Sequence, residues 1–297
     1  MRFKIDDAFL EKADLCGRDK MTAALLKKHP SIFSTTVANS ILSQPIDAIY
    51  VGDGEKYITI VAAHHALESI TANIAFLLAD FLMSNREFGV IRGINCKWLL
   101  SKYRFVILPC VNPDGVEMRY HGASDSPLRE RQVRMSGGNF SSWQANARGV
   151  DLNHNYDLGF TEYKTIEKEK GIVPGATLYS GEYPESEPET KGVASLVRTL
   201  SPVSVVSLHT QGEEIFAFPD TAVMRRRGAK IAAACGYTLS TPRGTASYGG
   251  LCDYTGSLGI PSFTFELGRG VNPLPESDVP GIFARVAEVL ATIPSLL

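Results

Sequence analysis

The sequence predicts an α/β fold in which helices flank a mixed, twisted sheet, and it predicts a single domain over residues 1–297. Apolar runs of strand length alternate with helical patterns from about residue 57 to the end of the chain. No repeat, low-complexity tract or linker interrupts that alternation. The apolar fraction of 44% and the charged fraction of 21% are typical of a globular chain. A chain of 297 residues is also long enough to bury one large core.

The expected elements follow one another along the chain. Residues 8–28 are predicted to form a helix, and one or two edge strands complete an N-terminal part, residues 1–50, that packs on the same core. Short runs rich in β-branched and aromatic residues indicate buried strands at 57–62, 104–110, 203–208 and 261–265. Helical patterns are found at 67–83, 187–200, 221–234 and 279–293.

A long polar stretch, residues 111–185, separates the second and third of these strands and is rich in Gly, Asn, Ser and Pro. We expect a loop here. Loops of this length in a compact domain usually carry function. Part of the functional site is therefore expected in this stretch.

The net charge and the pattern of the first residues argue against several classes of protein. A net charge of -2 argues against a nucleic-acid partner, because phosphate binding needs a concentrated basic surface. The basic cluster Arg225, Arg226 and Arg227 falls in a predicted helix, where we expect a solvated face. The first residues lack the pattern of a secretory signal, and no stretch reaches the roughly 18 apolar residues of a membrane span. A cytoplasmic location without a membrane partner is expected.

The cysteines do not predict a disulfide framework or a cysteine-ligated zinc site. Their number is odd and no C-x-x-C pair occurs. We expect small core residues or bystanders. The five are Cys16, Cys96, Cys110, Cys235 and Cys252.

His65 and Glu68 follow the first buried strand and stand three residues apart where a helical pattern begins. On the first turn of a helix this spacing brings an imidazole nitrogen and a carboxylate toward one point, where they can share a cation. A chance occurrence is the plain alternative, because six histidines among many acidic residues produce the pattern by accident.

Two further polar residues end buried strands. His209 closes the strand at 203–208, and the carboxyl ends of strands are where open α/β sheets place their ligands. A histidine bonded to a backbone carbonyl is the alternative. Glu266 ends the strand at 261–265, and a carboxylate after so apolar a strand costs free energy unless it is paired or used. We therefore predict a metal held by His65, Glu68 and His209, with Glu266 as a general base whose pKa is raised.

Five segments in this order give the chain a resemblance to a known family. They are Ala63-His64-His65-Ala66-Leu67-Glu68, Val111-Asn112-Pro113-Asp114-Gly115, Val150-Asp151-Leu152-Asn153-His154-Asn155, the strand-final His209, and Ser262-Phe263-Thr264-Phe265-Glu266-Leu267. Over almost the whole chain this resembles the zinc carboxypeptidase superfamily, whose ligands in carboxypeptidase A are two histidines and a glutamate. The resemblance implies a carboxypeptidase-like fold, one Zn²⁺ per chain and a peptide substrate.

The resemblance also implies a mechanism. Zinc lowers the pKa of its bound water and polarises the scissile carbonyl, while Glu266 takes the water proton and returns it to the leaving amine. Asp151 resembles the carboxylate that orients the first histidine ligand. Arg148 matches the arginine that stabilises the oxyanion in compact relatives, with Arg131 and Arg134 as alternatives.

The chain departs from carboxypeptidases at two positions. His154 follows Asn153 where the family has an arginine that forks the terminal carboxylate of the substrate, and histidine cannot make that fork. Tyr248 stands three residues beyond the position of the mobile tyrosine of the family, which Thr245 occupies. We still expect Asn153, His154 and Tyr248 to bind substrate.

Three segments resemble one branch of the superfamily, the bacterial γ-D-glutamyl-meso-diaminopimelate peptidases that cut murein stem peptides. The segments are Asp151-Leu152-Asn153-His154-Asn155, Tyr179-Ser180-Gly181 with Ser186-Glu187-Pro188-Glu189-Thr190, and Glu266-Leu267-Gly268-Arg269-Gly270-Val271-Asn272-Pro273-Leu274-Pro275.

This branch implies a pocket for a side chain with an amine and a carboxylate. Asp253 is the candidate for the amine and Arg269 for the carboxylate, with a surface arginine as the alternative for Arg269. Three other functions stay open. They are an ordinary metallocarboxypeptidase, an amidohydrolase of acyl-amino acids, and a peptide-binding module without catalysis, although such a module has no need of Glu266.

Overall fold

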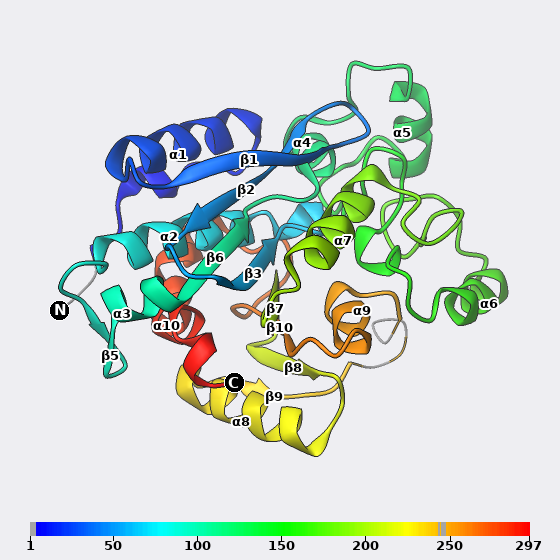
Figure 1. Ribbon diagram of the computed structural model, residues 1–297. Coiled ribbons are helices and arrows are strands. Elements are labelled where there is room, and N and C mark those ends of the chain that lie inside the picture. Colours follow the sequence, from blue (N-terminus) through cyan, green and yellow to red (C-terminus); the bar gives the residue numbers. More distant parts are fainter. Residues whose placement is uncertain (1–3, 243, 245–247) are drawn as a thin grey trace.

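The computed structural model describes residues 4–242, 244 and 248–297. Eight strands of this part form one mixed sheet (Figure 1). In spatial order they are β1 (Phe33–Asn39), β2 (Pro45–Val51), β6 (Tyr103–Leu108), β3 (Lys56–Ala62), β7 (Ser204–His209), β10 (Ser262–Glu266), β8 (Glu214–Phe218) and β9 (Thr238–Leu239). The mixed α/β fold with a large sheet between helices is confirmed.

The four central strands, β6, β3, β7 and β10, run parallel to one another. Their carboxyl ends therefore meet at one edge of the sheet, while antiparallel β2 and β8 border them on the two sides. Segments that leave β3, β7 and β10 emerge close together at this edge. The four buried strands predicted from the sequence are these four, each within two residues at either end.

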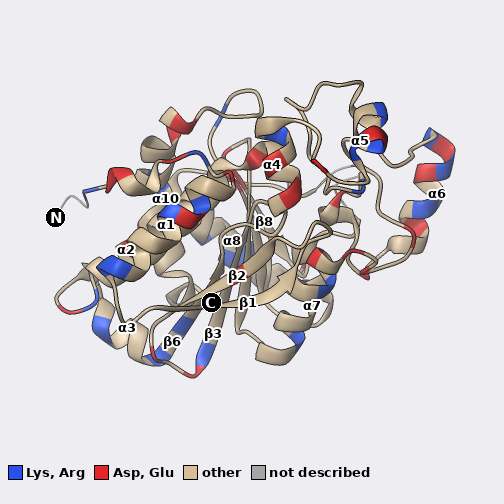
Figure 2. Cartoon of the chain, turned by 90° about the horizontal axis from the view of Figure 1, so that it is seen from above, with Lys and Arg blue, Asp and Glu red and all other residues tan. Residues whose placement is uncertain are grey.

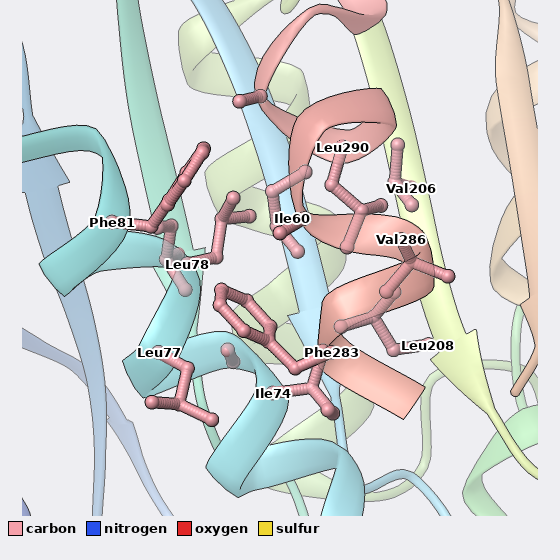
Figure 3. Close-up of a cluster of buried hydrophobic side chains, with 14 of the residues drawn as sticks. Ile60, Ile74, Leu77, Leu78, Phe81, Val206, Leu208, Phe283, Val286 and Leu290 are labelled. Carbon is pink, nitrogen blue, oxygen red and sulfur yellow. The ribbon is translucent and has the colours of Figure 1, made fainter. Parts of the chain in front are cut away.

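Helices cover both faces of the sheet (Figure 1). One face packs against α1 (Leu15–Lys28), α2 (Ile70–Ser84), α8 (Ala222–Cys235) and α10 (Val279–Ala291). The other face packs against α7 (Pro188–Leu200) and α9 (Leu251–Ser257). Figure 3 shows part of the larger core, where side chains of α2 and α10 such as Leu78 and Phe283 meet Ile60 of β3 and Val206 of β7.

The N-terminal helix is shorter than predicted. The structure has a 3₁₀ turn at Asp7–Phe9, and α1 begins only at Leu15. Asp14 ends the extended segment before the helix because its side chain caps α1, accepting a hydrogen bond from the backbone N–H of Gly17. The edge strands expected in the N-terminal part are β1 and β2. Of these two, only β1 lies at an edge of the sheet.

The expectation of a loop at 111–185 was wrong in part. This stretch holds α4 (Pro113–His121), α5 (Arg129–Ser136) and α6 (Phe160–Lys170), and irregular chain joins them. The three helices are short and polar, and in α5 only Gln132 is buried. They therefore lack the apolar periodicity by which a helix is recognised in a sequence. We call residues 111–187 the wall.

The remaining elements are small. The helix α3 (Cys96–Lys102) precedes β6, and β4 (Val90–Ile91) pairs with β5 (Ile94–Asn95) in a separate hairpin. Among the described residues, no helix has both the length and the apolar character needed to cross a membrane. The five cysteines are free, and Cys16 alone among them is exposed.

Candidate metal centre and active site

Three central strands deliver the candidate side chains to one edge of the sheet. His209 is the last residue of β7 and Glu266 the last of β10, and the two residues are paired in the parallel register. The chain leaving β3 turns at Ala63, which has a positive φ of 52°, and then reaches His65. The register of the sheet thus brings together residues that are up to 201 positions apart, from His65 to Glu266.

His65 and Glu68 lie on a 3₁₀ turn, Ala66–Glu68, rather than on the first turn of α2. His65 is the extended residue that begins this turn, with φ -94° and ψ 127°. The predicted helix at 67–83 was therefore wrong at its start, since α2 begins at Ile70. The three-residue spacing still directs both side chains to one point.

The predicted ligands form one cluster. The Nδ1 atom of His65 lies 2.9 Å from Oε1 of Glu68, and Nδ1 of His209 lies 3.0 Å from Oε2 of the same carboxylate. One ligand atom from each residue lies within 4.8 Å of the others. Glu68 and His209 are buried, while His65 is partly exposed, so the cluster can be reached from one side.

The electrostatics of the cluster suit a cation. Burial lowers the pKa of His65, but the carboxylates of Glu68 and Asp151 outweigh burial and raise it well above its usual value. Burial raises the pKa of Glu68, yet His65 and His209 outweigh it and bring the pKa to about 2. The buried carboxylate of Glu68 is thus negatively charged and lies beside a positive charge on His65. Two imidazoles and a carboxylate, with an open side, fit zinc in a catalytic site.

Neighbouring groups fix the orientation of the ligands. Oδ1 of Asp151 lies 3.2 Å from Nε2 of His65, and its Oδ2 accepts hydrogen bonds from the Leu178 N–H and the Thr177 hydroxyl. Burial would raise the pKa of Asp151, but the nearby His65 and His154 hold it well below its usual value. On the other ligand, the Ser207 hydroxyl lies 3.0 Å from Nε2 of His209. Each histidine therefore keeps Nδ1 for the metal side.

Glu266 lies beside the cluster and forms no side-chain hydrogen bond or ion pair with any described residue. Burial, opposed by His209 and aided by Glu68, raises the pKa of Glu266 to about 7. A carboxylate with this pKa can take up and release a proton near neutral pH. The raised pKa is the one expected from the sequence.

The three arginines proposed for the oxyanion differ in their surroundings. The Nε atom of Arg148 donates to Glu187 at 3.0 Å and its Nη2 to the Ser186 carbonyl. Arg131 lines the same pocket as Arg148, whereas Arg134 pairs with Glu130 on the exposed side of α5. The structure thus brings Arg131 and Arg148 together and leaves Arg134 outside.

His154 is buried beside Tyr248, which precedes α9. Its Nδ1 lies 2.8 Å from the Tyr248 carbonyl, and its ring stacks on Tyr163 with centroids 4.4 Å apart. Since Nδ1 donates to this carbonyl, the ring has only Nε2 left for another contact. Thr245, at the family position of the mobile tyrosine, lies outside the described residues.

Asn153 connects Asp151 to the start of α9, the helix that carries Asp253. The backbone N–H of Asn153 donates to Asp151, and its Oδ1 accepts from the Leu251 N–H. Asp253, in the first turn of α9, lines a pocket of about 600 Å³ together with Arg225 and Asp220. Burial raises the pKa of Asp253 to about 7.

Arg269 pairs with Glu213. The ion-pair distance is 2.7 Å, and the arginine side chain is 73% exposed. This surface ion pair corresponds to the alternative expected for Arg269.

Sequence reasoning missed three polar neighbours of the ligands, namely Ser207, Thr177 and His64. A signal existed for Ser207, because residues two apart on a strand point to the same side and Ser207 stands two before His209. The ring of His64 stacks on His209 with centroids 5.6 Å apart, and its Nε2 lies 2.9 Å from the Tyr156 hydroxyl. The three-residue spacing to Glu68 selects His65 over His64, and no pattern in the sequence indicates the contact of His64 with His209.

Comparison with known proteins agrees with this site. The family model described as zinc carboxypeptidase, Peptidase M14, matches residues 19–282. The chain therefore belongs to the zinc carboxypeptidase family and is a zinc-dependent metallopeptidase, a hydrolase that acts on peptides. His65, Glu68 and His209 would hold the zinc ion, which would supply a Lewis acid that activates water and polarises a carbonyl group.

Two individual relatives and one solved structure show how far the similarity extends. The chain is 32% identical over 266 residues to gamma-D-glutamyl-L-diamino acid endopeptidase 1 of Lysinibacillus sphaericus, a match that covers 86% of this chain and 65% of that protein. It is 31% identical over 116 residues to murein peptide amidase A of Escherichia coli K12, which covers 37% of each chain. The solved structure of thrombin activatable fibrinolysis inhibitor has the same fold, with a TM-score of 0.75 at 21% identity over 98% of this chain and 75% of that one.

Proposed function

We propose that this zinc peptidase hydrolyses the bond between γ-D-glutamate and meso-diaminopimelate in murein stem peptides. The observation that carries the proposal is the cluster of His65, Glu68 and His209 with the uncommitted carboxyl of Glu266 beside it. In this role Glu266 takes a proton from the attacking water and gives it to the leaving amine. Arg148, whose Nη1 forms no hydrogen bond with any described residue, is the candidate to stabilise the oxyanion.

The choice of substrate rests on two supports. One is the name of the Lysinibacillus relative, a gamma-D-glutamyl-L-diamino acid endopeptidase, together with that of the murein peptide amidase. The other is His154, whose ring is held by Tyr163 and the Tyr248 carbonyl and cannot fork a terminal carboxylate as an arginine does. Both disfavour an ordinary carboxypeptidase.

The pocket beside Asp253 suits the diaminopimelate side chain. That side chain ends in an amine and a carboxylate, and Asp253 is the candidate for the amine. Arg225 lines the same pocket and pairs with Asp220 at 2.7 Å, so it offers a cation where the carboxylate would lie. Both arginines have an acidic partner, and we assign the carboxylate to Arg225 ahead of Arg269 because only Arg225 lines the pocket of Asp253.

The test compares three peptides with the purified zinc enzyme. They are L-Ala-γ-D-Glu-meso-diaminopimelate, the same peptide with L-lysine in the last position, and a plain C-terminal dipeptide. We expect kcat/KM to be highest for the first and about 10- to 100-fold lower for the lysine peptide, since one charge-assisted contact is lost. Arg225→Ala should remove most of this difference, while Arg226→Ala, next to it on the same helix, is the matched control.

Equal rates on the diaminopimelate and lysine peptides would remove the diaminopimelate assignment. Faster turnover of the dipeptide would favour an ordinary carboxypeptidase, and turnover of acyl-amino acids alone would favour an amidohydrolase. Each of these results would leave the zinc peptidase standing. The binding module is not taken forward, because the family that the chain belongs to is described as zinc carboxypeptidase.

A further inference from the structure

A γ-linked glutamate presents a charge that an ordinary peptide lacks. The scissile bond is made by the side-chain carboxyl, so the α-carboxylate stays free on the acyl side of that bond. An enzyme that binds this residue has to accommodate the negative charge close to the reacting carbonyl. A cation that is not already paired would stabilise it.

The wall contains a second pocket with two guanidinium groups. It has a volume of about 130 Å³. The residues that line it are Arg131, Arg148, Val150, Pro174, Tyr179, Glu182, Tyr183, Ser186 and Glu187. It is distinct from the pocket of Asp253 and is lined by residues of α5 and of the segment that precedes α7.

The charges in this pocket are only partly matched. Glu187 is satisfied, because it accepts hydrogen bonds from Asn146, Arg148 and Ser186. Arg131 forms no hydrogen bond or ion pair with any residue in the described part of the chain. Glu182 lies in the same pocket and is likewise without an ion pair among the described residues. Arg131 is thus available to bind an anionic ligand, whereas the carboxylate of Glu182 would repel one.

The pocket adjoins the metal centre through Asp151. Val150 precedes Asp151 in the chain, and the backbone N–H of Asp151 donates to the Tyr179 carbonyl at 2.7 Å. Both Val150 and Tyr179 line the pocket. Asp151 in turn contacts the ligand His65 at 3.2 Å. The single residue Asp151 therefore links the pocket to the metal ligand His65, and we place the acyl part of the substrate on this side.

We infer that Arg131, on α5 in the wall, binds the free α-carboxylate of the γ-D-glutamyl residue on the acyl side of the scissile bond. The inference rests on the proposed function. It gives Arg131, an exposed residue that lines the pocket, a role in substrate recognition rather than in oxyanion stabilisation. Figure 2 shows α5 with charges of both signs at the same end of the molecule as α6.

The experiment changes the charge on each partner in turn. The two substrates are L-Ala-γ-D-Glu-meso-diaminopimelate and the same peptide with the glutamate α-carboxylate converted to a carboxamide. The enzymes are the unmodified protein, Arg131→Ala and Arg134→Ala. Arg134 is the matched control because it lies on the same helix and is also exposed, but pairs with Glu130 and does not line the pocket.

The unmodified enzyme should prefer the acid peptide by about 10- to 100-fold in kcat/KM, the effect of one charge-assisted contact. Arg131→Ala should lose this preference through a higher KM for the acid peptide, and its rate on the amide peptide should stay within about threefold of normal. Arg134→Ala should keep the preference. Glu182→Gln should increase it, since a like charge is removed.

Three results would overturn the inference. They are equal rates of the unmodified enzyme on both peptides, an equal loss on both peptides in Arg131→Ala, and an equal loss of preference in Arg134→Ala. An equal loss on both peptides in Arg131→Ala would assign that residue to the oxyanion or to the structure of the wall. Failure of the unmodified enzyme on both γ-D-glutamyl peptides, with activity on plain peptides, would instead reject the proposed function.

Discussion

The edge of the sheet and the wall build one site in different ways. At the edge, His209 and Glu266 end neighbouring strands, and the backbone ladder between β7 and β10 sets their separation. In the wall, Asp151 is held by polar bonds to Thr177 and Leu178, which come from a segment 26 residues or more further along the chain. The edge depends on sheet register, whereas the wall depends on buried polar side chains.

This difference predicts that the two regions can be changed separately. Substitutions at the edge should remove metal binding or catalysis and leave peptide selection intact. Substitutions in the wall should change stability, substrate affinity or ligand orientation. Asp151 stands between the two, because it belongs to the wall and contacts His65.

The largest effect is expected for Glu266→Gln at the edge. The amide keeps the shape of the side chain but cannot take the water proton, so kcat should fall by about 10²- to 10⁴-fold. Zinc content, measured by atomic absorption, should remain one per chain. Near-normal turnover in this variant would exclude Glu266 as the base, and loss of zinc would make it a ligand instead.

The edge could be predicted from the sequence and most of the wall could not. Strand ends are readable because β7 and β10 are apolar runs that stop at His209 and Glu266. The contacts of the wall are set by tertiary structure. Asn112, for example, donates to carbonyls at His64 and Gln144 that no local pattern connects to it. A polar side chain in such a stretch looks the same whether it faces solvent or a buried carbonyl.

Asp151→Asn tests the connection between wall and edge. An amide cannot accept from both the Leu178 N–H and the histidine ligand, so His65 should be less well oriented. We expect zinc affinity to fall by about 10- to 100-fold, as measured by competition with a chromogenic chelator. Asp114→Asn is the matched control, since Asp114 is also buried and accepts from Ser40 and Leu42 away from the metal centre. An equal loss of zinc affinity in both variants would contradict the role of Asp151.

Asn155→Ala tests the wall alone. The amide of Asn155 is buried and donates to the Ser180 and Tyr183 carbonyls, so its removal leaves these acceptors unsatisfied. The free energy of unfolding should fall by about 2 kcal/mol in urea titrations. KM should rise while zinc affinity stays unchanged.

Asn73→Ala, which removes a buried amide from α2, is the control for Asn155→Ala. It should lower the free energy of unfolding in a similar way without changing KM. If Asn73→Ala raises KM as much as Asn155→Ala does, the wall has no separate role in substrate binding.

The smallest change in the free energy of unfolding is expected for a change of one pH unit. It concerns Glu189, two residues beyond the wall. Glu189 on α7 is buried beside Asn146, with an oxygen to nitrogen distance of 3.5 Å, and burial raises its pKa to about 8. In the unfolded chain this carboxyl loses its proton near its ordinary pKa of 4.5, whereas the folded chain keeps the proton up to about pH 8. The unfolded state therefore binds fewer protons in this window, and folding stability falls as pH rises.

The glutamine side chain of Glu189→Gln cannot titrate. The free energy of unfolding of this variant should therefore increase relative to that of the unmodified protein between pH 5 and pH 8. The gain should be at most about 1.4 kcal/mol per pH unit. Urea titrations at pH 5.5, 6.5 and 7.5 measure it, with Glu130→Gln, on the exposed face of α5, as the control that shows no such trend. A difference that stays constant with pH would mean that Glu189 is ionised in the folded protein. The carboxyl of Glu189 beside Asn146 would then be charged in the folded protein and not protonated.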